Sequence, residues 1–286
     1  MFPYVKKKLS DAVTIRQHYE RRNKVLIKRK YGGFGDIIMQ RMMFQDFHEQ
    51  MPEINFTYTC PAKYINFAQN HPYMESLPIE SIVEKDYGAV YDISTACRVH
   101  ESVKGTKNNT HRSDIWANHC GVVLQNHECY MTCEEKNFYR EKLYEINTSK
   151  KPMVLFATRS TGCEFGQSKS LMDWQIKEIC QYFLENNLFV FTIHNDPIEV
   201  FTEMNIPQFV KIEPDSWKGL VAASDYVVSI DTATFHLAGA LKKPLLGIFS
   251  FTDGKVYGKY YDFVLVQKHR DNGDWDCGPC YVCCSC

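Results

Sequence analysis

The segment Ser229-Ile-Asp-Thr-Ala-Thr-Phe-His-Leu-Ala-Gly239 decides the fold, because it joins a buried strand to an apolar helix. The apolar run 226–230 predicts the strand, and the residues after it have helical spacing. Asp231 and Thr232 are residue types that begin helices. Unpaired amides at a helix start, helped by the helix dipole, can bind phosphate groups. His236 lies about one turn into this helix, where an isolated histidine is more often structural than functional.

The same alternation of short apolar strands with helices extends in both directions from this segment. We expect strands at 24–28, 54–59, 89–93, 153–157, 188–193, 226–230, 244–249 and 263–266. We expect helices at 3–22, 37–51, 61–70, 114–120, 134–146, 173–186, 216–223 and 232–241. Such an alternation predicts parallel sheets that are covered on both faces.

The stretch 147–152 has linker composition, and the strand–helix pattern restarts after it. We therefore expect an N-terminal Rossmann-like domain over 1–147, a C-terminal Rossmann-like domain over 153–266, and a Cys-rich tail over 267–286. In the helix expected at 173–186, the positions predicted to face inward are Trp174, Ile176, Ile179, Cys180, Phe183 and Leu184.

The composition is that of an ordinary globular protein, with 286 residues, 44% hydrophobic and 23% charged. The sequence contains neither an apolar stretch long enough for a membrane span nor a secretory signal, so we expect a cytoplasmic protein. Residues 1–30 hold ten Lys or Arg and two acids, a local charge near +8 on a chain of net charge −1. Such a basic end can attract an anionic partner such as nucleic acid, and it can equally be a solvated helix surface.

Two further loops, each between a strand and a helix, carry polar groups. In the first, Gly33 and Gly35 let the backbone approach a ligand, and Asp36 follows at the helix start. A carboxylate there would repel phosphate, so this turn fits the acceptor side of a reaction better than a pyrophosphate; alternatively, Asp36 only caps the helix. The second loop, 158–169, offers hydroxyl and cationic groups that suit a diphosphate, unless it is a polar surface loop.

Taken together, these segments resemble the heptosyltransferase family of GT-B glycosyltransferases (glycosyltransferase family 9). The resemblance runs over about residues 24–250 and is most specific in Ile230-Asp-Thr-Ala-Thr-Phe-His-Leu-Ala-Gly-Ala-Leu-Lys-Lys-Pro-Leu-Leu-Gly-Ile-Phe249. It is carried also by Tyr31-Gly-Gly-Phe-Gly-Asp-Ile-Ile38 and by the loop that ends at Lys169, with Trp174 shortly after it. It implies two facing Rossmann-like domains and an inverting transfer from a nucleotide sugar such as ADP-heptose to a hydroxyl group.

The resemblance also implies roles for individual residues. Asp36 is expected to be the general base, with Gly33 and Gly35 on the acceptor side, and no metal is expected to be needed for catalysis. The donor is expected to be bound by Thr158, Ser160, Thr161, Lys169, Asp231, Thr232, Ala233, Thr234 and His236, and its ribose by Asp196 or Glu199. A carboxylate on one side and cations and amides on the other match a reaction that builds negative charge on a leaving diphosphate.

Two departures from the family pattern concern the substrates rather than the reaction. Ala233 stands where the family usually has Gly, and the loop before Lys169 is longer than expected. The acceptor implied by the family is a lipopolysaccharide-type sugar. The basic N-terminus also permits a virus-type enzyme that glycosylates a modified DNA base, and a non-catalytic nucleotide-sugar or nucleic-acid binding module is a further alternative.

The tail contains five of the 12 cysteines, at Cys277, Cys280, Cys283, Cys284 and Cys286. The tetrapeptide Cys-Gly-Pro-Cys is similar to thioredoxin-type sites, but six residues after Cys280 are too few for the helix that such sites need. The spacing permits a structural zinc or iron site formed by Cys277, Cys280, Cys283 and Cys286 or Cys284, completed where needed by Cys129 or Cys133. Two alternatives remain open: the protein is a regulator controlled by metal in this tail, or the tail carries free thiols.

Overall fold

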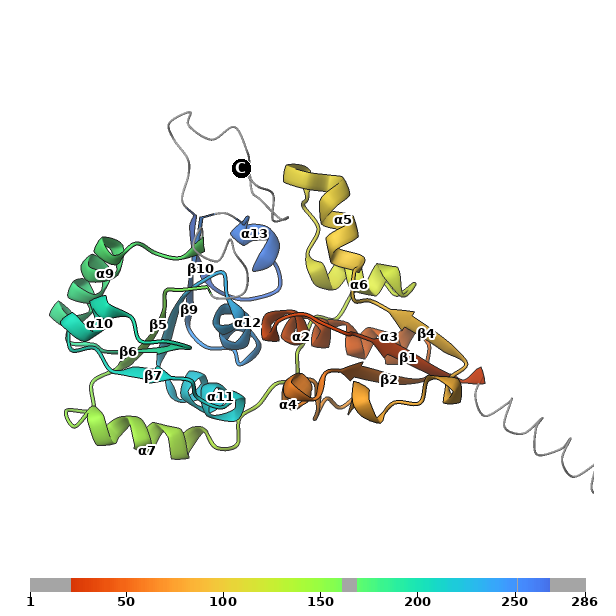
Figure 1. Ribbon diagram of the computed structural model, residues 1–286, viewed down its shortest axis with the longest axis horizontal. Helices are drawn as coiled ribbons and strands as arrows, with labels where there is room; N and C mark the ends of the chain where they lie inside the picture. Colours follow the sequence, from red (N-terminus) through yellow and green to blue (C-terminus); the bar gives the residue numbers. More distant parts are fainter. Residues whose placement is uncertain (1–21, 161–168, 251, 268–286) are drawn as a thin grey trace, which may run out of the picture.

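The computed structural model describes residues 22–160, 169–250 and 252–267, which form two parallel sheets (Figure 1). The first has the strand order β3-β2-β1-β4 and the second the order β10-β9-β8-β5-β6-β7. The strands are β1 (Lys24–Lys28), β2 (Asn55–Cys60), β3 (Glu75–Pro78), β4 (Ala89–Asp92), β5 (Met153–Ala157), β6 (Phe189–His194), β7 (Gln208–Val210), β8 (Tyr226–Ile230), β9 (Leu245–Phe249) and β10 (Val264–Gln267).

The helices lie between the strands in the chain. The α-helices are α2 (Phe34–Gln40), α3 (Phe44–Gln50), α4 (Ile65–Ala68), α5 (Ala96–Lys104), α6 (Arg112–His119), α7 (Lys136–Ile146), α9 (Asp173–Glu185), α10 (Glu199–Glu203), α11 (Pro214–Ala223), α12 (Ala233–Ala240) and α13 (Gly254–Tyr257). Short 3-10 turns are η1 (Arg41–Met43), η2 (Ala62–Tyr64), η3 (Ile79–Ser81), η4 (Glu84–Asp86) and η5 (Gly105–Lys107). None of the described helices is long and apolar enough to cross a membrane.

In both sheets the order of strands reverses next to the first strand of the sheet. The chain moves from β1 to β2 and β3 on one side, and then returns to place β4 on the other side; β5, β6, β7 and β8 repeat this pattern. In open parallel sheets, ligands bind at such a reversal, outside the carboxyl ends of the two strands. The topology therefore points to the carboxyl ends of β1 and β5 as the places where ligands would bind.

The strand β5 is buried along its whole length because both faces of its sheet are covered. Successive side chains of a strand point to opposite faces. Met153 and Leu155 accordingly belong to one apolar cluster, and Val154 and Phe156 belong to another that includes Ile176 of α9. This explains why the strand reads as an uninterrupted apolar run rather than as an alternating one.

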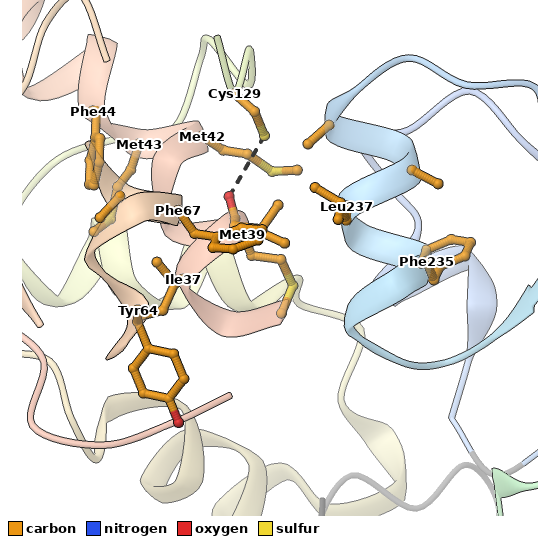
Figure 2. Packing of buried hydrophobic residues seen from close by; sticks show 14 of the residues in the cluster. Ile37, Met39, Met42, Met43, Phe44, Tyr64, Phe67, Cys129, Phe235 and Leu237 are labelled. Atoms are coloured by element: carbon orange, nitrogen blue, oxygen red, sulfur yellow. Dashed lines mark hydrogen bonds between the residues drawn. The ribbon is translucent and has the colours of Figure 1, made fainter. Parts of the chain in front are cut away.

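The two sheets are joined by an apolar contact between α2 and α12. Figure 2 shows Met39 and Met42, from the α2–η1 region, on the side that faces Leu237 of α12. All three are fully or almost fully buried and belong to one continuous cluster that also contains Ile27 of the first sheet and Leu245 of the second. The hydrophobic core therefore passes from one half of the molecule to the other.

Helix α7 packs with the second sheet, although it precedes the linker. The ring of Tyr139 lies against Gly219 of α11, and Arg140 donates to Asp225 with a distance of 2.8 Å. Judged by its packing, α7 thus belongs to the second half of the molecule. The domain boundaries expected from the sequence at 147, 153 and 266 remain predictions.

The predicted strands and most of the predicted helices match the structure within a few residues; the helix expected at 3–22 lies outside the described residues. The sequence did not predict β3, β7, α5, α10 or α13, which are short or polar. One prediction about α9 was wrong: Trp174 and Leu184 are 57% and 41% exposed rather than inward-facing. Ile176 and Cys180 alone bury fully, because one face of a helix of this length suffices to cover β5 and β6.

Candidate active site

Asp36 lies in the first turn of α2, directly beyond the carboxyl end of β1. The turn before it requires glycine, because Gly32 has φ of +143° and a Cβ there would lie 2.5 Å from the guanidinium of Arg29. Gly33 is the N-cap of α2, and no side chain caps this helix. Asp36 is therefore not an N-cap, and its carboxylate is available for another role.

Both carboxylate oxygens of Asp36 accept a hydrogen bond from an arginine. Nη2 of Arg29 donates to Oδ2 with a distance of 2.7 Å, and Nη1 of Arg112 donates to Oδ1 with a distance of 2.9 Å. Burial alone would raise the pKa of Asp36, but the charges of Arg112 and Arg29 outweigh it and hold the pKa below its ordinary value. Asp36 is thus a carboxylate at neutral pH, although its side chain is only 15% exposed.

Arg112, the first residue of α6, is itself fixed by further contacts. Its Nε and Nη2 donate to the two oxygens of Glu101 on α5, at 2.7 and 2.9 Å, which is the two-pronged geometry that arginine forms with carboxylates. The guanidinium lies 5.4 Å from the ring centre of Tyr257 on α13. The hydroxyl of Tyr257 donates to Glu101 with a distance of 3.2 Å.

On the second sheet, polar residues follow the neighbouring strands β8, β5 and β6. Asp231 follows β8, Thr158 follows β5, and Asp196 follows β6. These strands are parallel neighbours, so their carboxyl ends share one edge of the sheet. Most of the residues expected to bind the donor therefore lie along a single edge, at the reversal of strand order between β5 and β8.

Asp231 is the centre of a buried charge cluster on this edge. Nζ of Lys169 and Oγ1 of Thr252 both contact its Oδ2, at 2.6 and 2.7 Å. Nε2 of His236 lies 3.8 Å from its Oδ1. Burial opposes ionisation, but Lys169 and then His236 lower the pKa of Asp231 to about 2. Burial lowers the pKa of His236 to about 4, so this histidine is neutral at pH 7.

The start of α2 and the start of α12 touch each other across the two halves. A Cβ on Gly35 would lie 3.0 Å from Cδ2 of His236 and 3.4 Å from Cα of Ala233. The start of α2 therefore packs against the start of α12 without room for a side chain at Gly35. This contact brings the carboxylate of Asp36 close to the imidazole of His236, whose pKa it raises against the larger effect of burial.

The remaining donor residues differ in their exposure. Thr158 is buried, and in the described part of the chain its Oγ1 has no hydrogen-bond partner. The amide of Ser160 donates to Ser170 Oγ with a distance of 3.1 Å. Thr232 is the N-cap of α12 without a side-chain cap bond, and Thr234 is buried. The helix start thus keeps amides that no capping side chain occupies.

Thr161 lies outside the described residues. Asp196 and Glu199 are both exposed; Asp196 forms an ion pair at 3.6 Å with Lys211, and Glu199 is the first residue of α10. Both carboxylates are thus accessible at the same edge as Asp231, and each is placed equally well for the expected contact with a ribose.

Three partners of the predicted site residues were missed in the sequence. Arg29 was counted only as part of the basic N-terminal segment, although its place directly after the strand marks it as a site residue. Arg112 lies in the polar stretch that could not be assigned, and Thr252 lies after β9 in a loop without a recognisable motif. Only the three-dimensional contacts bring them to Asp36 and Asp231.

The cysteines proposed for a metal site, Cys277 to Cys286, lie outside the described residues. Of the two suggested additional ligands, Cys133 is half-buried, whereas Cys129 is buried and its Sγ lies 3.7 Å from the carbonyl oxygen of Ile38 (Figure 2). Burial raises the pKa of the Cys129 thiol to about 12, which disfavours the thiolate that metals require. Within residues 22–160, 169–250 and 252–267, no cluster of three or more His, Cys, Asp or Glu side chains is placed to bind a metal ion.

Residues 193–272 match the profile of glycosyltransferase family 9 (heptosyltransferase). The fold is similar to that of a glycosyl transferase family 9 protein from Veillonella parvula, with a TM-score of 0.63 and 12% identity over 87% of each chain. It is also similar to the ADP-heptose lps heptosyltransferase II of E. coli, with a TM-score of 0.59 and 14% identity over 87% of this chain and 92% of that one. A comparison with curated protein sequences found no match.

A third similar structure is the dodecameric iron-containing heptosyltransferase TibC of enterotoxigenic E. coli in complex with ADP-D-beta-D-heptose. Its TM-score is 0.63, with 15% identity over 89% of this chain and 64% of that one. The resemblance to the heptosyltransferase family predicted from the sequence is thus confirmed, and with it the GT-B fold of two facing parallel-sheet domains. These findings support a glycosyltransferase.

Proposed function

We propose that the chain transfers a sugar from an ADP-heptose-like donor to a hydroxyl group of the acceptor, with inversion at the anomeric carbon. The observation that carries the proposal is the contact between two helix starts that carry different chemical groups. Asp36 stands at the start of α2, and Lys169, Asp231 and His236 surround the start of α12. The match to the heptosyltransferase family supports the same reaction.

In this reaction the acceptor oxygen forms a bond to the anomeric carbon while the bond from that carbon to the diphosphate oxygen breaks. The acceptor proton goes to Asp36, and the negative charge goes to the leaving nucleoside diphosphate. Each oxygen of Asp36 accepts one hydrogen bond from an arginine, and a carboxylate oxygen has capacity for two. Each oxygen can therefore accept one more hydrogen bond, such as that from the acceptor hydroxyl. The ion pairs also make Asp36 a weak base, which suits a proton transfer that follows carbon–oxygen bond breaking.

On the donor side, Lys169 is paired with Asp231, which directly precedes the N-cap of α12. A bound diphosphate would compete with Asp231 for this ammonium group. Thr158 Oγ1 and the uncapped amides of α12 add neutral donors at the same edge. Together they would stabilise the charge that develops on the leaving group.

ADP-heptose and related nucleotide sugars are the donors to test, with release of the nucleoside diphosphate as the measurement. Asp36→Asn should lower turnover at least about 100-fold while leaving donor binding within about threefold, since general bases contribute on that scale. Asp262→Asn, at an exposed carboxyl that precedes β10, is the matched control. If every donor is inert and none binds, the proposed function is wrong; if Asp36→Asn keeps full activity, only the base is wrong.

A lipopolysaccharide-type sugar is the acceptor that the family match supports. The alternative of a modified DNA base depends on the basic segment 1–30, most of which lies outside the described residues. Salt-dependent DNA binding by the intact chain, compared with a chain that lacks residues 1–21, distinguishes the two. An intact chain without DNA affinity removes the alternative.

A further inference from the structure

The segment 252–260, which includes α13, contacts Asp231 in the second half and the partners of Asp36 in the first half. At its start, Thr252 donates to Asp231 in the donor cluster. Five residues later, the hydroxyl of Tyr257 donates to Glu101, and its ring lies beneath the guanidinium of Arg112. The same short segment therefore reaches the donor carboxylate and the partners of Asp36.

This segment is fixed to α6 of the first half by specific polar contacts. The amide of Ser113 donates to Nδ1 of His111, so Nε2 carries the proton and donates to the carbonyl oxygen of Tyr257 with a distance of 3.2 Å. Lys259 Nζ and the Tyr260 hydroxyl both donate to Asp114, at 2.9 and 2.5 Å. His111 is fully buried. Together, these contacts fix the position and orientation of Tyr257 relative to α6.

Arg112 has three kinds of contact, and only one of them is with Asp36. Glu101 occupies Nε and Nη2, Tyr257 covers one face of the guanidinium, and Nη1 remains for Asp36. A planar group that is held at one edge and on one face has little freedom left, so the direction of Nη1 is determined by Glu101 and Tyr257. Glu101 is buried and accepts from both of them.

We propose that Arg112 is a positioning residue for Asp36, and that Tyr257 from the other half of the molecule sets the place of Arg112. The catalytic carboxylate is then oriented only while segment 252–260 is docked on α6. Because the same segment holds Asp231 through Thr252, donor site and base are aligned by one element. The inference rests on the proposed role of Asp36 as the base.

The test measures the protonation of Asp36 directly, by a ¹³C NMR titration of its carboxyl carbon assigned with Asp36→Asn, and the pH profile of kcat/KM beside it. The charged groups that face Asp36 are Arg29, Arg112 and His236, and burial keeps His236 neutral above pH of about 4. Arg112→Gln should raise the pKa of Asp36 by about one unit or more, and move the acidic limb of kcat/KM upward equally. Arg112→Lys keeps the charge but not the two-pronged contact, so its shift should be smaller.

Tyr257→Leu should shift the Asp36 titration in the same direction as Arg112→Gln but less, whereas Tyr226→Leu, at an exposed tyrosine of β8, should not shift it. If Arg112→Gln does not fold because Glu101 loses its partner, the double variant Arg112→Gln with Glu101→Gln removes both charges and serves instead. An unmoved Asp36 titration in these Arg112 variants overturns the positioning role.

A shift with Arg112→Gln but none with Tyr257→Leu overturns the part of the proposal that concerns the two halves. The NMR titration does not require turnover, and this separates the inference from the proposed function. If the Asp36 titration shifts as expected but Asp36→Asn leaves the enzyme active, Asp36 is not the general base. The coupling between Arg112 and Asp36 still holds in that case.

Discussion

Replacing Lys169 by Met should destabilise the protein through Asp231, the buried carboxylate with which it pairs at 2.6 Å. The pKa of Asp231 is lowered to about 2 from an ordinary value of 3.8. At about 1.4 kcal/mol for each pH unit, a shift of this size corresponds to about 2.5 kcal/mol of stability at neutral pH. Asp231 is only 7% exposed, so water replaces little of the lost ion pair.

The sign follows from the direction of the shift. Because the folded-state pKa is lowered, the contribution is complete above pH of about 4 and is lost as the pH falls towards 2. Because Lys169 contributes most among the groups that lower this pKa, the variant should lose about 2 to 3 kcal/mol in urea unfolding at pH 7, followed by tryptophan fluorescence. The double variant Lys169→Met with Asp231→Asn should recover part of that loss, because no buried charge is left without its partner.

Lys177→Met is the matched control, since Lys177 pairs with Glu203 at 2.7 Å but both side chains are about half exposed. Exposed pairs contribute about 0–1 kcal/mol. The reasoning is refuted if the loss with Lys169→Met is no larger than the loss with Lys177→Met, or if the double variant is less stable than Lys169→Met alone.

Further predictions concern glycines and buried histidines. Gly32→Ala should cost about 1–3 kcal/mol in urea unfolding and raise the pKa of Asp36 in the same NMR titration, because a Cβ at φ of +143° is strained and displaces Arg29; an unchanged pKa would contradict it. Gly219→Ala should destabilise by a similar amount in urea unfolding despite the better helix propensity of alanine, since its Cβ would lie 2.0 Å from a tyrosine ring of α7. Gly33→Ala meets no atom within 4 Å and should cost less, about 0.5 kcal/mol, because alanine is a poorer N-cap than glycine. His111, with a pKa lowered by burial to about 3, is neutral in the fold, so the unfolded chain takes up a proton first. This histidine should lower stability by about 2 kcal/mol between pH 6.5 and 5, and His236, with a pKa of about 4, adds a loss in the same direction; a constant urea midpoint over that range would refute it.

The sequence predicted the strands of both sheets because their faces are covered, which makes each strand an apolar run between turns. The positions of Asp36, Lys169 and Asp231 followed from the same logic, since each lies near the junction between a strand and the helix that follows it. The family resemblance then assigned them opposite sides of one reaction. What this reasoning supplied was the edge of each sheet, not the side chains that surround each site.

Arg112 and Tyr257 could not be placed near Asp36 from the sequence because they come from distant places in the chain. Arg112 is 76 residues away from Asp36, and Tyr257 is a further 145 residues along. The approach of Arg112 depends on how α6 packs against α2, and that of Tyr257 depends on how the two halves dock. No local pattern encodes either arrangement. The exposed Trp174 failed for a different reason: a helical apolar stripe can be wider than the face that the sheet covers.

The apolar contact between α2 and α12 has a thermodynamic consequence. Met39 and Leu237 belong to one cluster that extends into both sheets, so separating the halves would expose side chains that are now 2% and 0% accessible. Two domains with separate cores can melt one after the other, whereas a shared core ties their melting together. Calorimetry should therefore show a single transition whose van't Hoff and calorimetric enthalpies agree, and two resolved transitions would mean that the contact contributes little to stability.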